Sequence, residues 1–400
     1  MTRRIIILGS TGSIGTQALE VIEHINALHS RGQFPFAYEV VGLAAGRNAK
    51  LLEQQAARFN VHDIALAGNP ADFELVESCE SRTDQYSCRM GPAAAAELVE
   101  AVPCDLVLAA MVGSAGLPAT LAAVELGRDV ALANKETLVA AGELIIPAAR
   151  TSGAKLLPVD SEHAALWQCL TTPTPPPLEA PKGLAKAILT ASGGPFRTST
   201  KAQIAAATPE AALKHPTWSM GRKVTIDSAS LMNKALEVIE ARWLFGLPAD
   251  RIDALIHPQS LVHAMAQFDD GSLIAQLAAP DMRAPIQHAL TWPHRTDGVS
   301  RRLDLATLKS LDFEPIDHDR FPLFALGHQA IRRGGTAGAI LSAANEAAVA
   351  AFLAGGVSFG KMQDAVLNAV ESIEPGPLSS IEDCLRAECE ARNLVNRALC

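Results

Sequence analysis

Short apolar runs alternate with stretches of helical spacing along the first 158 residues. The runs cover residues 5–8, 40–43, 64–66, 106–108, 129–133 and 156–159. Continuous aliphatic runs are typical of strands buried on both faces of a parallel sheet. Because strands that alternate with helices build βαβ units, the pattern predicts an α/β fold with a doubly wound parallel sheet in this part of the chain.

The rest of the chain has a different pattern. Residues 171–181 contain five prolines and predict a loop, whereas the charged, aperiodic residues 292–319 are typical of a linker. Ser379 to Glu382 fit a capping box before the last helix. Residues 78–90 predict no particular element. Four alanine-rich stretches of helical spacing predict a C-terminal helical bundle, at residues 323–333, 337–354, 359–372 and 380–397.

A glycine-rich turn follows the first apolar run. Gly9, Gly12 and Gly15 stand three residues apart, and helical spacing begins directly afterwards. Glycines let the backbone approach a pyrophosphate, whose charge is stabilised at a helix N-terminus. The spacing differs from the commoner Gly-x-Gly-x-x-Gly, so it predicts a variant Rossmann-like dinucleotide site. The alternative is a structural strand-to-helix turn.

The predicted second strand, residues 38–45, indicates which dinucleotide is bound. It ends in Gly46, Arg47 and Asn48, where an NAD enzyme usually has an acid for the ribose 2′-hydroxyl. An arginine suits a 2′-phosphate instead, so the sequence favours NADP over NAD. A solvated loop arginine is the alternative.

Composition excludes several classes of protein. Of 400 residues, 48% are hydrophobic and 19% charged, which suffices for two or three ordinary domains. The net charge of −9, without a basic run, argues against binding to nucleic acid or to a membrane. Seven scattered cysteines fit free thiols in a reducing cytosol, so we expect a cytoplasmic protein. The uncharged residues 106–124 contain glycines and a proline, which favour strand, turn and helix over a membrane span.

Two acids follow the last apolar run of the sheet. Asp160 and Glu162 flank Ser161 and, in an extended chain, would project to the same side. Such a pair repels itself unless a cation is near. Mg²⁺ or Mn²⁺ with oxygen ligands would provide one, given a third acid. The alternative is a pair of solvated loop acids.

Two further segments carry candidate chemistry. Asn134, Lys135 and Glu136 follow a strand at the end where open α/β sheets bind ligands, and Lys135 there can polarise a carbonyl. Ser192, in the glycine turn after a strand at residues 188–191, can present its hydroxyl to an anion. A surface lysine and a plain turn are the alternatives.

Residues 227–240 predict one helix entered through a serine. Asn233, Lys234 and Glu237 share its polar face, which a solvated lysine–glutamate pair would also explain. If Glu237 joins Asp160 and Glu162, three carboxylates form an open metal site. A phosphate could then be held by other polar side chains of this third of the chain, namely Ser192, His215, Ser228, Asn233 and Lys234.

Eight motifs occur in order along the chain. They are Gly-Ser-Thr-Gly-Ser-Ile-Gly at 9–15, Ala-Asn-Lys-Glu at 133–136, Pro-Val-Asp-Ser-Glu-His at 158–163, Ala-Ser-Gly-Gly-Pro-Phe at 191–196, His-Pro-Thr-Trp-Ser-Met-Gly at 215–221, Met-Asn-Lys-Ala-Leu-Glu at 232–237, Ile-His-Pro-Gln-Ser at 256–260 and Pro-Asp-Met-Arg at 280–283. With these motifs the chain resembles the 1-deoxy-D-xylulose 5-phosphate reductoisomerase family over essentially its whole length. Residues 28–36 and 171–181 depart from the family pattern and predict loops.

The resemblance implies an NADPH- and divalent-metal-dependent homodimer that converts 1-deoxy-D-xylulose 5-phosphate into 2-C-methyl-D-erythritol 4-phosphate. Mg²⁺, Mn²⁺ or Co²⁺ would be held by Asp160, Glu162 and Glu237, which with Lys135 form the catalytic set. NADPH would contact Thr11, Gly12, Ser13, Ile14, Gly46, Arg47, Asn48, Asn134, Glu136 and Gly221. Substrate would contact Lys135, Ser161, Glu162, Ser192, His215, Trp218, Ser228, Asn233, Lys234 and Glu237.

The same resemblance implies four parts: a cofactor domain at residues 1–158, a catalytic domain at 159–291, a linker at 292–319 and a helical domain at 320–400. Residues 215–221 have no periodicity, and Pro216 and Gly221 could delimit a flap that closes Trp218 over the substrate. The alternative is that Trp218 anchors the loop to a core.

Two other functions remain open. Another NADP-dependent dehydrogenase would share the first 150 residues but would not need three carboxylates. An NADP-sensing protein without activity could lose Lys135 or Glu237, and both are present. Within the reductoisomerase reading, retro-aldol/aldol and direct 1,2-shift routes would use the same residues.

Overall fold

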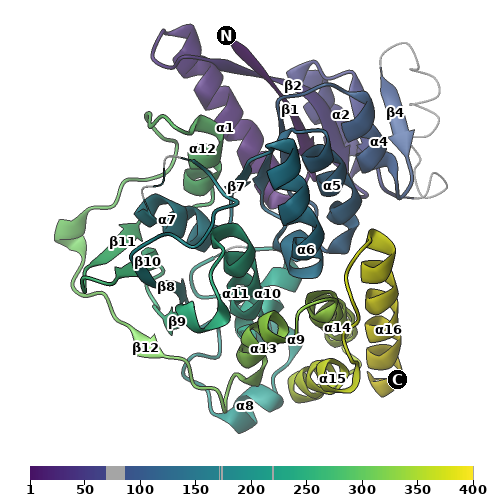
Figure 1. The fold of residues 1–400 in the computed structure, drawn as a ribbon, viewed down its shortest axis with the longest axis vertical. Helices are drawn as coiled ribbons and strands as arrows, with labels where there is room; N and C mark the ends of the chain where they lie inside the picture. Colours follow the sequence, from purple (N-terminus) through teal and green to yellow (C-terminus); the bar gives the residue numbers. More distant parts are fainter. Residues whose placement is uncertain (69–85, 171, 173, 219, 400) are drawn as a thin grey trace. The chain divides into compact units, whose positions relative to one another are not determined.

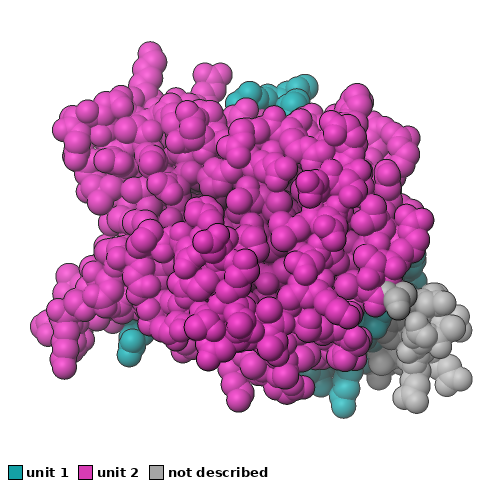
Figure 2. Space-filling model, turned by 90° about the horizontal axis from the view of Figure 1, so that it is seen from below, with its two compact units in different colours: residues 1–137, 147–160, 281–301 teal, residues 138–146, 161–280, 302–400 magenta. Residues whose placement is uncertain are grey.

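The computed structural model describes residues 1–68, 86–170, 172, 174–218 and 220–399. The chain forms two compact units, shown in teal and magenta in Figure 2. Unit 1 contains residues 1–137, 147–160 and 281–301, and unit 2 contains residues 138–146, 161–280 and 302–400. The expected four-part division stays a prediction.

Unit 1 is built on a seven-stranded sheet in the order β4-β3-β2-β1-β5-β6-β7 (Figure 1). Every neighbouring pair is parallel. The order reverses beside β1, which is the place where doubly wound sheets bind ligands. The strands are β1 (Thr2–Leu8), β2 (Ala37–Ala45), β3 (Asp63–Leu66), β4 (Ser87–Met90), β5 (Leu106–Ala109), β6 (Asp129–Leu132) and β7 (Leu156–Pro158).

Aliphatic side chains bury this sheet as the apolar runs predicted. Residues 5–8 of β1 are fully buried, as are residues 106–108 of β5, so both faces of the central strands are covered. The helices of the unit are α1 (Ser13–Ser30), α2 (Ala49–Phe59), α4 (Ala94–Ala101), α5 (Leu117–Glu125) and α12 (Arg283–Thr291), with a short 3₁₀ turn η2 (Ser114–Gly116). Residues 106–124 are therefore strand, turn and helix, as expected.

Helix α6 (Lys135–Ser152) follows β6, and its residues 138–146 belong to unit 2. Its backbone departs from helical geometry at Ala141. No helix within the described ranges is both long and apolar enough to span a membrane.

Unit 2 contains a five-stranded mixed sheet in the order β11-β10-β8-β9-β12. Strands β8 and β9 pair in parallel, and the other pairs are antiparallel. Helix α7 (Ser161–Leu170) packs against β10 and β11. The strands are β8 (Leu184–Ala191), β9 (Ile252–Ile256), β10 (Val262–Phe268), β11 (Leu273–Leu277) and β12 (Glu314–Pro315).

The remaining elements of unit 2 are helical. Figure 1 shows the last four helices gathered into a bundle at the C-terminal end, which confirms the predicted helical region. The helices are α7 (Ser161–Leu170), α8 (Lys201–Ala205), α9 (Pro209–Ala212), α10 (Arg222–Ala229), α11 (Met232–Phe245), α13 (Ala325–Arg333), α14 (Ala337–Leu353), α15 (Phe359–Ser372) and α16 (Ile381–Leu399), with 3₁₀ turns η3 (Ala249–Arg251), η4 (Leu305–Thr307) and η5 (Pro322–Phe324).

Three local predictions need correction, and one segment without a prediction has a defined structure. The predicted loop at residues 28–36 begins later, because α1 continues to Ser30. Residues 87–90, left without an assignment, form β4, whereas residues 78–85 lie outside the described ranges. The capping box of α16 is shifted by one residue: Ser380 Oγ accepts the Asp383 N–H, and the Asp383 carboxylate accepts the Ser380 N–H.

The third correction concerns residues 227–240, which form two helices and not one. Helix α10 ends at Ala229, and Leu231, with a φ of 56°, turns the chain into α11. A left-handed residue cannot continue a right-handed helix, and this turn has no periodicity from which to predict it. The described part of residues 171–181 is a loop, as predicted.

Candidate active site

The glycine turn after β1 has the geometry that a pyrophosphate needs. The φ of Gly9 is +84°, and its N–H donates to the Ala44 carbonyl. An added Cβ on Gly15 would lie 2.4 Å from the Gly9 carbonyl oxygen, so only glycine fits there. Gly12 is the N-cap of α1 and provides no side-chain cap, which leaves N–H groups of the first turn available to an anion. Thr11, Ser13 and Ile14 are exposed or half-exposed around this turn.

The loop after β2 presents a cation to solvent. Gly46, Arg47 and Asn48 are exposed. The Asn48 side chain accepts the Leu51 N–H and caps α2, a structural role that was not predicted from the sequence. Arg47 stands directly before that cap, at the carboxyl end of β2.

Asn134, Lys135 and Glu136 begin α6 after β6. Buried Asn134 accepts the Thr137 N–H at 2.9 Å and donates to the Gly113 carbonyl at 2.9 Å. It therefore fixes the helix start and the segment after β5. Lys135 forms an ion pair with Asp160, and Glu136 is buried in the first helical turn.

The Asp-Ser-Glu segment is not extended, contrary to the prediction. Asp160 precedes α7, and Ser161 and Glu162 form its first turn. Side chains two residues apart point in different directions on a helix, whereas on a strand they share a side. The carboxylates of Asp160 and Glu162 nevertheless lie close together. Carboxylate oxygens of Asp160, Glu162 and Glu237 lie within 4.8 Å of one another. The three predicted metal ligands are thus brought together.

Lys234 neutralises two of these acids from inside the protein. Its ammonium lies 2.8 Å from Glu162 Oε1 and also contacts Glu237 Oε2. Lys234 and Glu237 are 2% and 1% exposed, so the predicted polar face of this helix is not a solvated surface. Burial alone would lower the pKa of Lys234, but the two carboxylates outweigh it and raise that pKa above its usual value. Asn233 donates to Glu237 Oε1.

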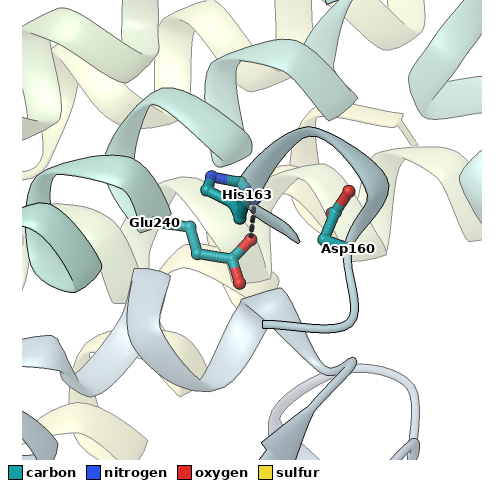
Figure 3. Close-up of side chains that lie close together, drawn as sticks. All are labelled: Asp160, His163 and Glu240. Atoms are coloured by element: carbon teal, nitrogen blue, oxygen red, sulfur yellow. Dashed lines mark ion pairs between the residues drawn. The ribbon is translucent and has the colours of Figure 1, made fainter. Parts of the chain in front are cut away.

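A second layer of polar side chains, not predicted from the sequence, lies behind Glu237. Figure 3 shows His163 and Glu240 turned toward each other, and His163 Nδ1 lies 3.2 Å from Glu240 Oε2. The other ring nitrogen, Nε2, lies 2.9 Å from the Glu237 carbonyl oxygen. His163 therefore positions the backbone of Glu237. In the sequence, the one sign of this role is that His163 directly follows Asp-Ser-Glu.

Asp160 also lies within 4.8 Å of the His163 and Glu240 ligand atoms, so two groups of three could hold an ion. The group with His163 has no exposure at either His163 or Glu240, and these two already pair with each other. The all-carboxylate group has the oxygen donors that Mg²⁺ and Mn²⁺ prefer. The donor chemistry therefore fits a hard divalent ion at Asp160, Glu162 and Glu237.

Ser192 is prepared to donate a hydrogen bond. His215 Nδ1 accepts the N–H groups of Thr217 and Trp218 at 3.2 and 2.8 Å, so the imidazole proton is on Nε2. That Nε2 lies 2.9 Å from Ser192 Oγ, which also accepts the Gly194 N–H at 3.1 Å. Because these two donors occupy the acceptor positions of Ser192 Oγ, the Ser192 hydroxyl proton is available to donate to an anionic oxygen. Burial lowers the pKa of His215 and keeps it neutral.

Ser228 stands beside the same turn. A Cβ on Gly194, whose φ is +63°, would lie 2.7 Å from the Ser228 carbonyl oxygen, so the Ser192 turn and the end of α10 are in close contact. Trp218 is half-buried, and its ring centroid lies 6.2 Å from that of His263. Gly221 is the exposed N-cap of α10.

Comparisons with known proteins point to one family in successive parts of the chain. Three family models match, described as 1-deoxy-D-xylulose 5-phosphate reductoisomerase at residues 5–142, its C-terminal domain at 156–245 and the DXP reductoisomerase C-terminal domain at 277–394. The chain is 46% identical to the 1-deoxy-D-xylulose 5-phosphate reductoisomerase of Burkholderia multivorans, over 98% of this chain and 96% of that protein. It is 45% identical to the protein of the same name from Bacteroides fragilis, over 100% and 98%.

Solved structures are similar as well. The reductoisomerase from Zymomonas mobilis in complex with NADPH is 39% identical, with a TM-score of 0.87 over 100% of this chain and 98% of that chain. A DOX-P reductoisomerase in complex with NADPH, fosmidomycin and magnesium is 34% identical, with a TM-score of 0.89 over 99% and 98%.

Proposed function

The chain belongs to the 1-deoxy-D-xylulose 5-phosphate reductoisomerase family, and on this premise we propose that it converts 1-deoxy-D-xylulose 5-phosphate into 2-C-methyl-D-erythritol 4-phosphate with NADPH and a divalent metal ion. The observation that carries the proposal is the convergence of Asp160, Glu162 and Glu237 within 4.8 Å. A simple NADP-dependent dehydrogenase would not need such a cluster.

The first part of the proposal is the NADPH site. The turn residues Thr11, Gly12, Ser13 and Ile14 bind the pyrophosphate through backbone N–H groups at the start of α1. Exposed Arg47 binds the 2′-phosphate, with Gly46 and Asn48 shaping its loop. NADPH supplies the hydride. Asn134, Glu136 and Gly221 complete the proposed cofactor contacts.

The second part is the metal site. Asp160, Glu162 and Glu237 would hold Mg²⁺, Mn²⁺ or Co²⁺, which would supply Lewis-acid polarisation of substrate oxygens. In this structure lysines compensate the acids: Lys135 pairs with Asp160, and Lys234 pairs with Glu162 and Glu237. These lysines can turn to substrate oxygens once another cation neutralises the acids. The rearranged substrate would be an aldehyde, which hydride from NADPH reduces to the alcohol. Lys135 would then stabilise the aldehyde oxygen as it gains negative charge.

The third part is the substrate's phosphate. Ser192, Ser228, Asn233 and Lys234 provide hydroxyl, amide and ammonium donors, and neutral His215 aligns the Ser192 hydroxyl. Ser161 lies in the first turn of α7 and binds the sugar chain beside Glu162. Trp218 closes over the substrate and excludes water from charged intermediates. The proposed enzyme is a homodimer, as the family resemblance implies, and its scattered cysteines favour the reducing cytoplasm.

A coupled assay tests the proposal. NADPH absorbance is followed with 1-deoxy-D-xylulose 5-phosphate, with and without a chelator, and then after Mg²⁺ is restored. We expect oxidation of NADPH that stops on chelation and returns with Mg²⁺. Substrate-dependent turnover that is indifferent to exhaustive chelation would favour a simple dehydrogenase. No turnover with any divalent ion, while NADPH still binds, would favour a sensor.

A further inference from the structure

Asn345, in the C-terminal helical region, lies far in sequence from every residue assigned above. It is on α14, is 1% exposed, and its Nδ2 donates to Asp227 Oδ1 at 2.8 Å. Asp227 is on α10 and is also 1% exposed. Its other oxygen, Oδ2, lies 2.8 Å from the Lys223 ammonium. Both oxygens of this buried carboxylate therefore have a partner, and one comes from α14.

Asp227 lies immediately before Ser228 at the end of α10. The Asp227 carbonyl accepts the Ser230 hydroxyl at 3.2 Å, and Ser230 Oγ accepts the Met232 N–H at 3.3 Å. These bonds form the turn from α10 into α11, which begins with Met232 and continues with Asn233 and Lys234. Fixing Asp227 thus fixes the place of Ser228 relative to the first turn of α11.

We propose that Asn345 is a positioning residue for substrate phosphate: by holding Asp227 it keeps Ser228 in register with Asn233 and Lys234. The inference rests on the proposed function, which it deepens by giving the C-terminal helical region a part in substrate affinity. A buried carboxylate needs its hydrogen-bond donors, so loss of the Asn345 amide would let the end of α10 move until Asp227 finds another partner. Small displacements of a binding group weaken a phosphate site without abolishing it.

The test is a double-mutant cycle between Asn345→Leu and Ser228→Ala. Leucine has the same branching at Cγ as asparagine, is larger, and cannot donate to Asp227. We expect Asn345→Leu alone to raise the KM for 1-deoxy-D-xylulose 5-phosphate and the Kd for fosmidomycin about tenfold, the range of one charge-assisted hydrogen bond. The Kd for NADPH stays unchanged. In the Ser228→Ala background the same substitution has little further effect, because coupled residues are not additive.

Two variants separate positioning from general stability. Ser342→Ala removes an equally buried hydroxyl from the same helix, without touching Asp227, and leaves the KM unchanged. The exchange Asp227→Asn with Asn345→Asp restores a carboxylate–amide bond and recovers part of the affinity lost in Asn345→Leu. Should Asn345→Leu fail to fold, Asn345→Ser provides the same cycle.

The inference is overturned if the rise in KM is the same in both backgrounds, or if the melting temperature falls while KM and the fosmidomycin Kd do not move. These results leave the proposed function intact, since the wild-type enzyme is active in both. Absence of wild-type activity with 1-deoxy-D-xylulose 5-phosphate would instead reject the proposed function.

Discussion

The glycine turn of unit 1 and the Glu162–Lys234–Glu237 cluster of unit 2 hold charge in opposite ways. The turn offers backbone N–H groups at the exposed start of α1, and its geometry depends on the absence of side chains at Gly9 and Gly15. The cluster depends on charged side chains: Glu237 and Lys234 are almost completely buried, and His163 with Glu240 forms a second layer.

The difference lies in how each region holds its geometry. A backbone site needs only local conformation, so its sequence signature is short and contiguous. A buried charged site must be compensated by partners from other elements, because an isolated buried charge is costly. The first region should therefore respond to changes in shape, and the second to changes in charge.

The largest effect should come from Glu237→Gln, which keeps shape and removes one charge from the cluster. We expect kcat to fall about 1000-fold or more, because the carboxylate is a proposed metal ligand and a partner of Lys234. Equilibrium titration should give an unchanged Kd for NADPH. Exposed Glu371→Gln on α15 is the matched control. Wild-type kcat in the variant would remove Glu237 from the metal site.

Arg47→Asp should have the next largest effect. It replaces the cation beside the proposed 2′-phosphate with a repelling acid, so the ratio of kcat/KM for NADPH to that for NADH should fall about 100-fold. Steady-state kinetics with both cofactors measure the ratio. Arg31→Asp, exposed after α1, is the control. An unchanged ratio would place the 2′-phosphate elsewhere.

Gly15→Ala tests shape in the glycine turn. The added Cβ would lie 2.4 Å from the Gly9 carbonyl oxygen and 2.5 Å from Ser10 Cα, so the turn must open. We expect a Kd for NADPH about 30-fold higher and a loss of about 1–3 kcal/mol in unfolding free energy. At Gly356 an added Cβ meets nothing within 4 Å, and Gly356→Ala should change neither quantity. Equal effects at both sites would contradict the close-approach argument.

Trp218→Ala tests the proposed flap. Because Trp218 is only half-buried, its loss should lower kcat/KM about tenfold while the melting temperature of the unliganded protein changes little. Limited proteolysis near Thr217 should be suppressed by NADPH with fosmidomycin. Loss of about 3 kcal/mol or more in stability, with protease resistance independent of ligand, would establish the alternative core anchor.

The smallest effect concerns pH. Burial lowers the pKa of His215 below its usual 6.5, so the folded state favours the neutral ring that accepts the Trp218 N–H. This contribution to stability is present above about pH 6.5 and is lost as the pH falls through the lowered pKa. We expect kcat/KM to fall a few-fold more steeply on the acid side in wild type than in His215→Gln. Ionisation of the substrate affects both proteins equally. Identical pH profiles of kcat/KM would therefore show that His215 is not the group whose protonation lowers activity.

Much of the architecture could be predicted because periodicity reports local structure. Buried strands β1, β5 and β6 were visible as apolar runs, and the helices after residue 322 were visible as repeats of apolar positions. The α10–α11 turn was not visible, since it depends on one residue, Leu231, in a left-handed conformation. The shifted capping box failed for a similar reason, because Asp383 can replace the glutamate of the usual motif.

The candidate site shows the same division. The sequence by itself determined the ligand types: acids at 160, 162 and 237, donors around Ser192, and a glycine turn before α1. Only the tertiary structure decided which cation neutralises which acid and which groups support it. The Lys234–Glu162, His163–Glu237 and Asn345–Asp227 contacts join residues 72, 74 and 118 positions apart. Periodicity carries no information over such separations, because these pairs form only when packing places their helices together and burial makes an unpaired charge too costly.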